Sequence, residues 1–330
     1  MDSMQRYRGL IVVVLGGSGF LGRWVARKLC LQGALVHLVV RNRAHAKTVF
    51  AQYGVDGEIF ELDLANDAGA LRDLLLAVRP VITFNLAGYG IDHAERDEEA
   101  SYKTNAQLVS AVCDALAVLK PRRRLGQEII HVGSALEYGA IGGNLAEDSE
   151  PKPTTIYGKS KLAGTQALTE RCRTLGISGL TARLFTLYGP GEHEDRLLPS
   201  LLRCGETGEL LEMTSGTQQR DFTYVEDAAE GLLRLGLANT SPGSIVNLAT
   251  GRLASVRSFA ETAASLLRIP SDQLKFGALA TRAEEMAHSA VSIDRLRDIV
   301  AWNPTISIAD GISRTLRFKN ASIAVRESHD

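Results

Sequence analysis

The chain has 330 residues, of which 45% are hydrophobic and 23% charged, and its formal net charge is -1. This amount of apolar material predicts a large core, organised as one big domain or two smaller ones. The near-neutral charge gives no general attraction to nucleic acid or to an anionic membrane. No apolar stretch approaches ~18 residues, so we expect neither a membrane span nor a signal peptide.

The cysteines and histidines do not predict a metal site. The cysteines are scattered, with no CxxC spacing, which is typical of a reduced cytoplasmic protein. The histidines share no local ligand spacing, and His131 lies inside an apolar strand, where a structural role is expected. The residues concerned are Cys30, Cys113, Cys172, Cys204, His93, His131, His193 and His288.

A dinucleotide-binding unit is predicted at the start of the chain. Residues 10–15 form a short β-branched run typical of a buried parallel strand, and a glycine turn and a helical pattern follow it. Glycines there let the backbone approach a pyrophosphate, which the helix N-terminus stabilises. The alternative is a turn that only packs a helix on a strand. The turn residues expected at the cofactor are Gly16, Ser18, Gly19, Phe20, Leu21 and Gly22.

The second predicted strand, residues 34–40, is followed by Arg41, Asn42 and Arg43. An acidic residue at this strand end would accept hydrogen bonds from the adenosine ribose and reject a 2′-phosphate. The chain has no acid there, and the forked donors of arginine suit phosphate. The sequence therefore favours NADP over NAD, with arginines solvated on a loop as the alternative.

Three more strands are predicted at residues 58–62, 81–85 and 128–132, and a long helical stretch covers about 96–119. Ligands bind beyond the carboxyl ends of parallel strands, so the residues after each strand are expected at the same edge as the glycine turn. An adenine is expected near the end of the third strand, and small residues after the fourth let a cofactor pass closely. The residues expected there are Asp63, Leu64, Leu86, Ala87, Gly88 and Ser134.

A helix that begins behind a proline-rich turn carries Tyr157 and Lys161. Positions i and i+4 share one helix face, so the phenol and the ammonium point the same way. A positive charge close to a phenol favours the phenolate, which makes the pair a candidate general acid/base. The same spacing also occurs on solvated helix faces. The pair therefore predicts catalysis only if the rest of the chain supplies a hydride carrier and a substrate pocket.

The strand–helix alternation predicts an α/β fold with a Rossmann-like, doubly wound parallel sheet and a smaller C-terminal α/β substrate-binding cap. Another strand is predicted at 179–185, after which the pattern loosens into shorter elements. Residues 1–185 are expected to form mainly the NAD(P)-binding domain. Residues 186–330 are expected to form mainly the cap, with some segments rejoining the main sheet.

The order of these motifs resembles the extended short-chain dehydrogenase/reductases, and in particular their nucleotide-sugar branch. The resemblance covers roughly residues 10–312. It rests on the glycine turn, Asp63, the Asn85-Leu-Ala-Gly88 segment, Ser134, the Tyr157-x-x-x-Lys161 pair, and the segments 183–190 and 220–227.

The resemblance implies a role for each site residue. Tyr157 would move a proton to or from a sugar oxygen while nicotinamide exchanges a hydride, and Lys161 would hold the nicotinamide ribose and depress the Tyr157 pKa. Ser134 would hydrogen-bond the reacting oxygen. Arg220 would clamp the sugar diphosphate, with a surface ion pair as its alternative, and Glu285 would bind the nucleotide ribose, with a solvated helix charge as its alternative. Asn105 and Phe185 are placed at the cofactor, and Leu136 and Thr186 at the substrate.

Departures from the family pattern narrow the expected reaction. The 4,6-dehydratases carry an Asp-Glu pair after their equivalent of Ser134, where this chain has Ala135 and Leu136, which cannot transfer protons. Thr186 stands where many relatives have an asparagine that contacts the substrate pyrophosphate. The missing acid after the second strand also departs from typical 4-epimerases, which retain NAD through the cycle.

The expected activity is therefore NADPH-dependent reduction of a nucleotide-linked 4-keto-6-deoxy sugar. The alternatives are an NAD-dependent nucleotide-sugar 4-epimerase, a reductase of non-sugar carbonyls and a non-catalytic NADP-sensing regulator. The resemblance also implies a homodimer built on a four-helix bundle from residues 96–119 and 155–174. Apolar residues of these helices serve that interface or face the sheet, namely Leu108, Val112, Leu116, Leu162 and Leu168.

Overall fold

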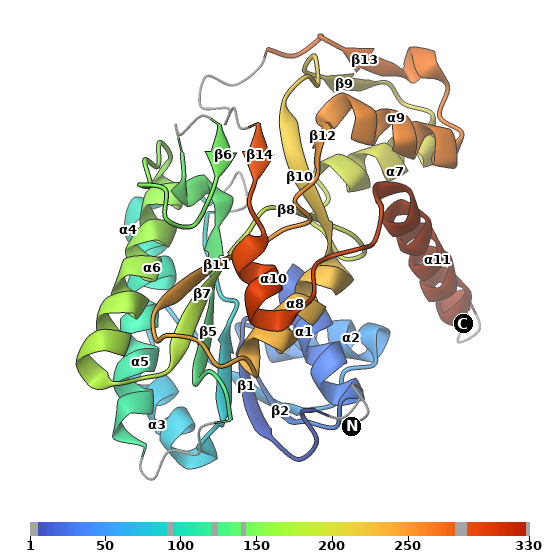
Figure 1. Cartoon of the computed structure of the whole chain (residues 1–330). Helices are drawn as coiled ribbons and strands as arrows, with labels where there is room; N and C mark the ends of the chain where they lie inside the picture. The colour runs from blue at the N-terminus through green and yellow to red at the C-terminus, as the bar shows by residue number, and fades with distance from the viewer. Residues whose placement is uncertain (1–5, 91–94, 120–124, 140–142, 281–288, 328–330) are drawn as a thin grey trace.

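The computed structural model describes residues 6–90, 95–119, 125–139, 143–280 and 289–327. A seven-stranded parallel sheet runs through its centre in the order β11-β7-β5-β4-β1-β2-β3 (Figure 1). Its strands are β1 (Ile11–Leu15), β2 (Leu35–Val40), β3 (Glu58–Glu61), β4 (Ile82–Asn85), β5 (Ile129–Ser134), β7 (Gly179–Leu184) and β11 (Ser244–Leu248).

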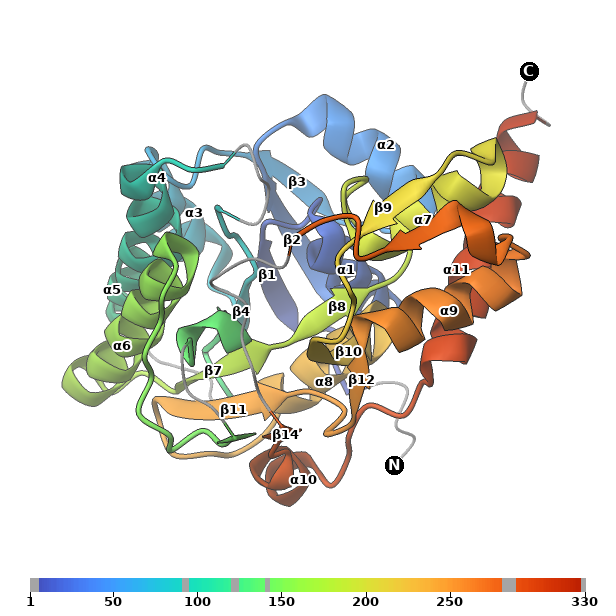
Figure 2. The ribbon, with the colours of Figure 1, turned by 90° about the horizontal axis from the view of Figure 1, so that it is seen from above.

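Helices cover both faces of this sheet (Figure 2). Alternate residues of β1 show why: Val12 and Val14 pack into one core cluster, and Val13 and Leu15 into another, because successive strand residues point to opposite faces. The first cluster includes α1 (Phe20–Leu31), α2 (Arg43–Tyr53) and α8 (Val225–Gly236), and the second α3 (Ala68–Val78), α5 (Leu108–Val118) and α6 (Ile156–Leu175). The predicted doubly wound α/β sheet is confirmed.

The helical stretch predicted over 96–119 is not one regular helix. It is divided into α4 (Glu98–Tyr102), a π-helical turn (Lys103–Gln107) and α5. Asn105 lies in the wide turn, and its side-chain amide bonds to both backbone groups of Tyr89. Wide helical turns of this kind occur frequently at functional sites.

The apolar residues weighed for a dimer interface mostly face the sheet. Leu108, Val112, Leu116 and Leu168 are all at most 3% exposed, and they belong to the core between α5, α6 and the sheet. They are therefore used by the fold of the single chain. Leu162 is half-buried.

The C-terminal half supplies a smaller second layer and also returns to the main sheet. In the main sheet β11 pairs with β7, and α8 packs on α1. The smaller part has a three-stranded sheet and a two-stranded sheet around a core that includes Phe222 and Phe259. Its elements are β8 (Thr186–Tyr188), α7 (Leu197–Thr207), β9 (Leu211–Met213), β10 (Gln219–Tyr224), β12 (Leu253–Ser255), α9 (Val256–Leu267) and β13 (Leu274–Phe276).

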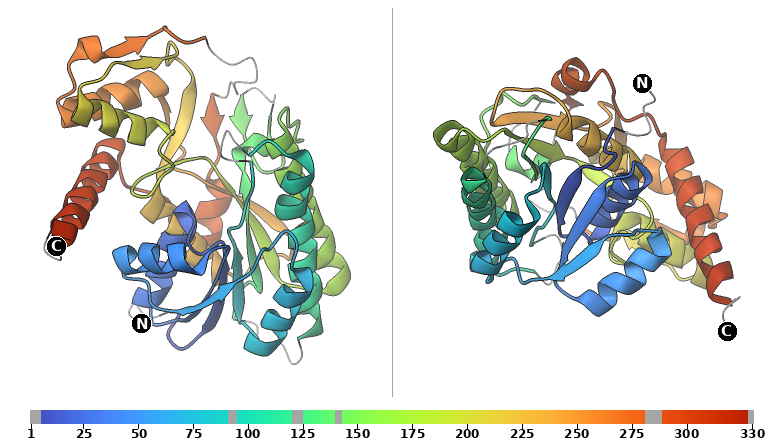
Figure 3. Two further views of the ribbon diagram at one scale, coloured as in Figure 1. Left: turned by 180° about the vertical axis from the view of Figure 1, so that it is seen from behind. Right: turned by 90° about the horizontal axis from the view of Figure 1, so that it is seen from below.

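Two further features tie the halves together. Strands β6 (Asn144–Leu145) and β14 (Ala290–Val291) pair in parallel, and α10 (Asp294–Val300) follows β14. The last helix, α11 (Ile308–Glu327), packs on α9 (Figure 3). The centre of its Phe318 ring lies 5.5 Å from that of Trp24 and 4.9 Å from that of Tyr53. Within the described residues, no helix has the length and apolar composition needed to cross a membrane.

The glycine turn after β1 yields a first prediction. A Cβ on Gly22 would lie 2.1 Å from the Gly16 carbonyl oxygen and 2.9 Å from that of Gly17, and both contacts are with backbone. We expect Gly22→Ala to open the turn, to destabilise the fold by about 1–3 kcal/mol and to weaken dinucleotide binding. Thermal unfolding and titration with NADPH measure both effects.

The matched control is Gly69→Ala in α3, where an added Cβ meets no atom within 4 Å. Because alanine favours helix over glycine, this variant should be neutral or slightly stabilised and should bind NADPH normally. A Gly22→Ala protein with wild-type stability and affinity would contradict the role given to the close approach.

Candidate active site

The carboxyl ends of the parallel strands lie at one edge of the sheet, which is seen from above in Figure 2. Most of the predicted cofactor residues follow these strands in sequence. A Cβ on Gly16 would lie 3.0 Å from the Ala87 nitrogen, so the turn after β1 touches the segment after β4. In this turn Arg23 donates to the carbonyl oxygens of Ser18 and Gly19. Phe20, Leu21 and Leu86 are half-buried and pack against the core.

The end of β2 carries the two arginines proposed for the 2′-phosphate. Arg41 and Arg43 are both exposed, and Asn42 caps α2 by accepting a hydrogen bond from the His45 N–H at 2.8 Å. The structure adds a carboxylate that sequence reasoning missed. Glu61, at the end of the neighbouring strand β3, accepts the backbone N–H of Arg43 at 2.7 Å.

The two residues expected near an adenine lie directly after β3. The Asp63 carboxylate accepts hydrogen bonds from the Ala65 N–H at 3.1 Å and from Asn66 at 2.7 Å, so it shapes its own turn. The Leu64 side chain is 9% exposed and packs in the core with α3.

Ser134 is the last residue of β5, and a short 3-10 turn, Ala135–Glu137, follows it. Its hydroxyl oxygen accepts the Leu136 N–H at 3.1 Å, while the Glu137 carboxylate accepts the Ser134 N–H at 2.8 Å. This reciprocal arrangement is a capping box, which fixes both the backbone and the side chain of the serine.

Tyr157 and Lys161 lie in the first turns of α6, beside the end of β5. The helix begins where the Thr155 side chain accepts the Gly158 N–H at 3.0 Å. Lys161 is 2% exposed, its ammonium donates to the Val132 carbonyl oxygen at 3.1 Å, and it lies 5.9 Å from the centre of the Tyr157 ring. The fold therefore brings the predicted serine, tyrosine and lysine together.

Burial dominates the electrostatics of this group. It raises the pKa of Tyr157 well above its ordinary value, Glu137 and Glu95 raise it further, and Arg196 and a hydrogen bond from Ser134 lower it. Burial also lowers the pKa of Lys161 to about 8. Arg196 and Ser134 thus lower the Tyr157 pKa in this structure, and the lowering by Lys161 that the resemblance implies stays a prediction.

Asn105 and Gly88 complete the neighbourhood of the lysine. The Asn105 amide donates to the Ser160 hydroxyl at 2.9 Å as well as to the Tyr89 carbonyl, which ties the π-helical turn to α6. A Cβ on Gly88 would lie 3.3 Å from the Lys161 nitrogen and 3.6 Å from the Asn105 amide oxygen. The space over Gly88 is thus bordered by a cation and an amide.

These observations fit a dinucleotide. Gly16 and Gly22 leave no room for side chains against the turn, and Gly88 places no side chain against the Lys161 ammonium. In that arrangement the glycine turn would hold the pyrophosphate, and Lys161 and Tyr157 would hold the nicotinamide ribose. The chemistry that a bound nicotinamide supplies is hydride transfer.

Of the residues expected at the substrate, Leu136 follows β5 and Thr186 follows β7, at the same edge. Leu136 is half-buried and packs against Tyr138 and Leu145, and Thr186 begins β8. Phe185, expected at the cofactor, packs against the same two residues. Arg220 lies on β10, where burial lowers the pKa of its guanidinium. Glu285 lies outside the described residues.

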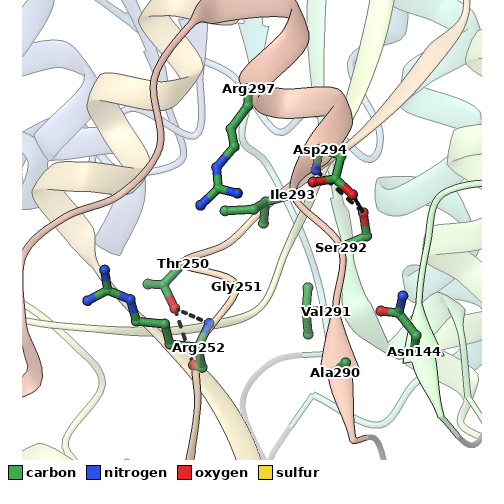
Figure 4. Close-up of a pocket in the computed structure, with 10 residues that line it drawn as sticks. All are labelled: Asn144, Thr250, Gly251, Arg252, Ala290, Val291, Ser292, Ile293, Asp294 and Arg297. Atoms are coloured by element: carbon green, nitrogen blue, oxygen red, sulfur yellow. Dashed lines mark hydrogen bonds between the residues drawn. The ribbon is translucent and has the colours of Figure 1, made fainter.

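A cavity of about 410 Å³ opens beside these elements, between the β6–β14 pair and the loop after β11 (Figure 4). The Asp221 carboxylate, next to Arg220, shapes its rim by accepting the N–H groups of Thr250, Gly251 and Arg252. The lining of the cavity includes none of Ser134, Tyr157 and Lys161. The cavity is lined by Asn144, Thr250, Gly251, Arg252, Ala290, Val291, Ser292, Ile293, Asp294 and Arg297.

Three charged residues near the site were not predicted as site residues from the sequence. Glu95 accepts the Gly90 N–H at 2.8 Å, and its charge raises the pKa of Tyr157. Glu192 and Arg196, after β8, form an ion pair at 3.6 Å. No motif spacing marks these three residues. Glu137, by contrast, shows the Ser-x-x-Glu spacing of a capping box.

His131 is fully buried and its ring lies 3.4 Å from the Asn85 side-chain nitrogen, as befits the predicted structural histidine. Burial, with Lys161 nearby, lowers its pKa well below the ordinary value. Among the described residues there is no group of three or more His, Cys, Asp or Glu side chains able to hold a metal ion.

The chain belongs to the NAD dependent epimerase/dehydratase family, whose profile matches residues 12–249. It is 28% identical to dTDP-6-deoxy-L-talose 4-dehydrogenase (NAD(P)(+)) of Kitasatospora kifunensis, over 91% of this chain and 93% of that protein. It is 27% identical to GDP-6-deoxy-D-mannose reductase of Pseudomonas aeruginosa, over 72% of this chain and 79% of that protein. The UDP-glucose 4-epimerase of Thermotoga maritima, solved with UDP-glucose, superposes with a TM-score of 0.83 at 18% identity and covers 95% of this chain and 100% of that one.

The predicted family and fold are thereby confirmed. The chain is an NAD(P)-dependent enzyme of the extended short-chain dehydrogenase/reductase type. The alternative of a non-catalytic NADP-sensing regulator is not needed to explain it.

The buried carboxyl of Glu192 yields a prediction on pH. Burial raises the pKa of Glu192 from 4.5 to about 7, so between these values the folded state holds its proton more tightly than the unfolded state does. Wild-type stability should therefore fall as pH rises through this window. Glu192→Gln should gain about 1–3 kcal/mol in free energy of unfolding, relative to wild type, between pH 5 and pH 8.

Urea unfolding at the two pH values measures this gain. The exposed neighbour serves as the control, since Glu194→Gln should follow wild type at both pH values. If the free energy of unfolding of Glu192→Gln differed from that of wild type by the same amount at pH 5 and pH 8, the raised pKa of Glu192 would be contradicted.

Proposed function

We propose that the enzyme reduces the 4-keto group of a 4-keto-6-deoxyhexose attached to a nucleoside diphosphate, with NADPH as the hydride donor. The observation that carries the proposal is the convergence of Ser134, Tyr157 and Lys161 next to Ala135 and Leu136, where no side chain can transfer a proton. Relatives that are named as a 6-deoxysugar 4-dehydrogenase and a 6-deoxysugar reductase support it.

The electrostatics of Tyr157 suit an acid. Burial holds its pKa above the ordinary value, so the phenol is protonated near neutral pH and can donate a proton to a developing alkoxide. Ser134 donates to the same oxygen, and the Lys161 ammonium holds the ribose and stabilises negative charge on the phenol oxygen. Reduction of a ketone needs these three contributions and no further acid or base.

The residues after Ser134 disfavour a dehydratase. Elimination of water from the sugar needs a proton donor and an acceptor, but Ala135 and Leu136 are apolar and pack toward Tyr138, Leu145 and Phe185. An apolar wall at this place suits a sugar that carries a methyl group at C6.

The preference for NADPH is proposed from Arg41 and Arg43. Both guanidinium groups are exposed at the end of β2, and the Glu61 carboxylate already accepts the N–H at the start of α2. Binding of the 2′-phosphate of NADPH would therefore depend on the side chains of Arg41 and Arg43. The rival function is an NAD-dependent nucleotide-sugar 4-epimerase, which the Glu61 carboxylate beside this place favours.

The proposal includes a homodimer in the cytoplasm. All four cysteines are free, as a reducing compartment requires. The inward apolar residues of α5 and α6 are used by the core, so the outer faces of these helices are left to form the interface. Light scattering of the purified protein tests the dimer.

Tyr157→Phe tests the acid. Loss of the hydroxyl should lower kcat about 10²–10⁴-fold with nucleotide-linked 4-keto-6-deoxy sugars, because the proton donor is gone. The dissociation constant for NADPH should change little. Tyr102→Phe, on α4, is the matched control and should retain activity. Activity close to wild type in Tyr157→Phe would exclude the proposed acid.

The double variant Arg41→Ala/Arg43→Ala tests the cofactor. It should weaken NADPH binding about 10- to 100-fold and leave NADH binding nearly unchanged, because only NADPH carries the 2′-phosphate. Lys47→Ala, an exposed cation on the same helix, controls for overall charge. Equal losses for both cofactors, or stoichiometric NAD in the purified protein, would favour the 4-epimerase.

A further inference from the structure

A fully buried carboxylate lies directly behind Ser134. Glu137 is 0% exposed, and its two oxygens accept three hydrogen bonds from three elements. One oxygen accepts the Ser134 N–H at 2.8 Å, at the end of β5. The other accepts the Thr165 hydroxyl of α6 at 3.0 Å and the Arg183 guanidinium of β7 at 2.9 Å. One side chain therefore connects the element that holds the serine with two of its neighbours.

Thr165 bonds to Glu137 from the face of α6 that also carries Tyr157 and Lys161. Tyr157, Lys161 and Thr165 follow one another at intervals of four residues, so they share one side of the helix. The Glu137 carboxylate thus fixes Ser134 relative to the helix face that carries the tyrosine and the lysine. Gly133 makes room for it, because a Cβ at that position would lie 2.4 Å from the carboxylate.

The fold alone does not account for this arrangement. Glu137 and Arg183 form an ion pair that is buried at 0% and 2% side-chain exposure. A buried ion pair of this kind is often no more stabilising than apolar residues of similar volume. Arg183 also stacks over the Tyr138 ring at 4.5 Å, while one of its terminal nitrogens has no hydrogen-bond partner among the described residues.

We propose that Glu137 is a positioning residue for the reduction, which holds Ser134 against α6 and sets the charge around Tyr157 and Lys161, with Arg183 as its counter-ion. The inference rests on the proposed function, since it deepens the role of the same site. Glu137, the glutamate of the Ser-x-x-Glu pattern, thus has a role in the reaction in addition to capping the short turn after β5.

The negative charge of Glu137 shifts the pKa values of Tyr157 and Lys161 in the same direction. It raises the pKa of Tyr157, which keeps the phenol protonated, and it raises the pKa of Lys161, which keeps the ammonium charged. Both protonated forms are the ones that reduction uses, so Glu137 extends activity toward higher pH. The other charged or titratable groups that interact with this pair are Arg196 and Glu95 toward Tyr157, and His131 toward Lys161.

The first test compares Glu137→Gln with Glu128→Gln. Glu128 lies just before β5, at the opposite end from Ser134; it is also buried, and it accepts the Ser178 N–H at 2.8 Å. Glu137→Gln should lower kcat about 10- to 100-fold, because a small displacement of reacting groups is costly, with KM for NADPH within about twofold. Glu128→Gln should keep the wild-type kcat and KM.

The pH profile supplies a readout that a purely structural role would not move. Without the negative charge, the pKa values of Tyr157 and Lys161 both fall, so the decline of activity on the alkaline side begins at a lower pH than in wild type. The alkaline limb of kcat/KM should shift downward by roughly one unit in Glu137→Gln and stay in place in Glu128→Gln.

Two further variants decide the matter if Glu137→Gln does not fold. Thr165→Val removes one contact without leaving an unpaired charge, and it should lower kcat about 3- to 10-fold with the alkaline limb unchanged. Glu137→Gln/Arg183→Met removes both charges, retains an oxygen for the Ser134 N–H, and should shift the alkaline limb with a smaller loss in kcat.

Wild-type kcat and an unmoved alkaline limb in a folded Glu137→Gln protein, or in the double variant, would overturn the proposal. Failure of the proposed function is seen separately, in the wild-type enzyme. If wild type reduces no 4-keto sugar but epimerises nucleotide sugars, the same variants are compared with that reaction, because it uses the same Ser134, Tyr157 and Lys161.

Discussion

Parallel pairing of the seven central strands is the constraint on which the site depends. Because the strands run the same way, the segments after β1, β2, β4 and β5 all emerge at one edge, where a dinucleotide and a substrate can meet. The helices that return the chain lie on both faces and leave this edge open. The C-terminal half contributes β11 and α8 to the main sheet, and with Arg220 on β10 it places a cation in the smaller layer.

Burial gives this edge its chemical character. The desolvated phenol of Tyr157 keeps its proton, and the desolvated ammonium of Lys161 holds its own less tightly than usual. A buried carboxylate, Glu137, favours the protonated form of each. That carboxylate has hydrogen-bond partners on β5, α6 and β7, so in our proposal the geometry and the protonation of the catalytic residues depend on the same side chain.

Local patterns predicted the main elements, and the structure brings the predicted Ser134, Tyr157 and Lys161 together. The β-branched runs, the glycine turn and the four-residue spacing of Tyr157 and Lys161 act over short distances, so the sequence carries them directly. The π-helical turn at Asn105 was not predicted, because contacts with the Tyr89 backbone and with Ser160, far away in sequence, accompany it. Glu61 and Arg196 were missed for the same reason, since their importance depends on which strands and loops become neighbours.

The measurement that tests the account most directly follows one hydrogen atom. The purified enzyme is incubated with NADPH deuterated at the transferable position of nicotinamide C4, together with dTDP- and GDP-linked 4-keto-6-deoxyhexoses, and the products are examined by mass spectrometry. The account predicts one deuterium at C4 of the sugar for each NADPH oxidised and released. The absence of deuterium in the sugar and of NADPH oxidation would contradict it, if a parallel incubation with nucleotide sugars that carry a 4-hydroxyl group gave the 4-epimer with tightly held NAD.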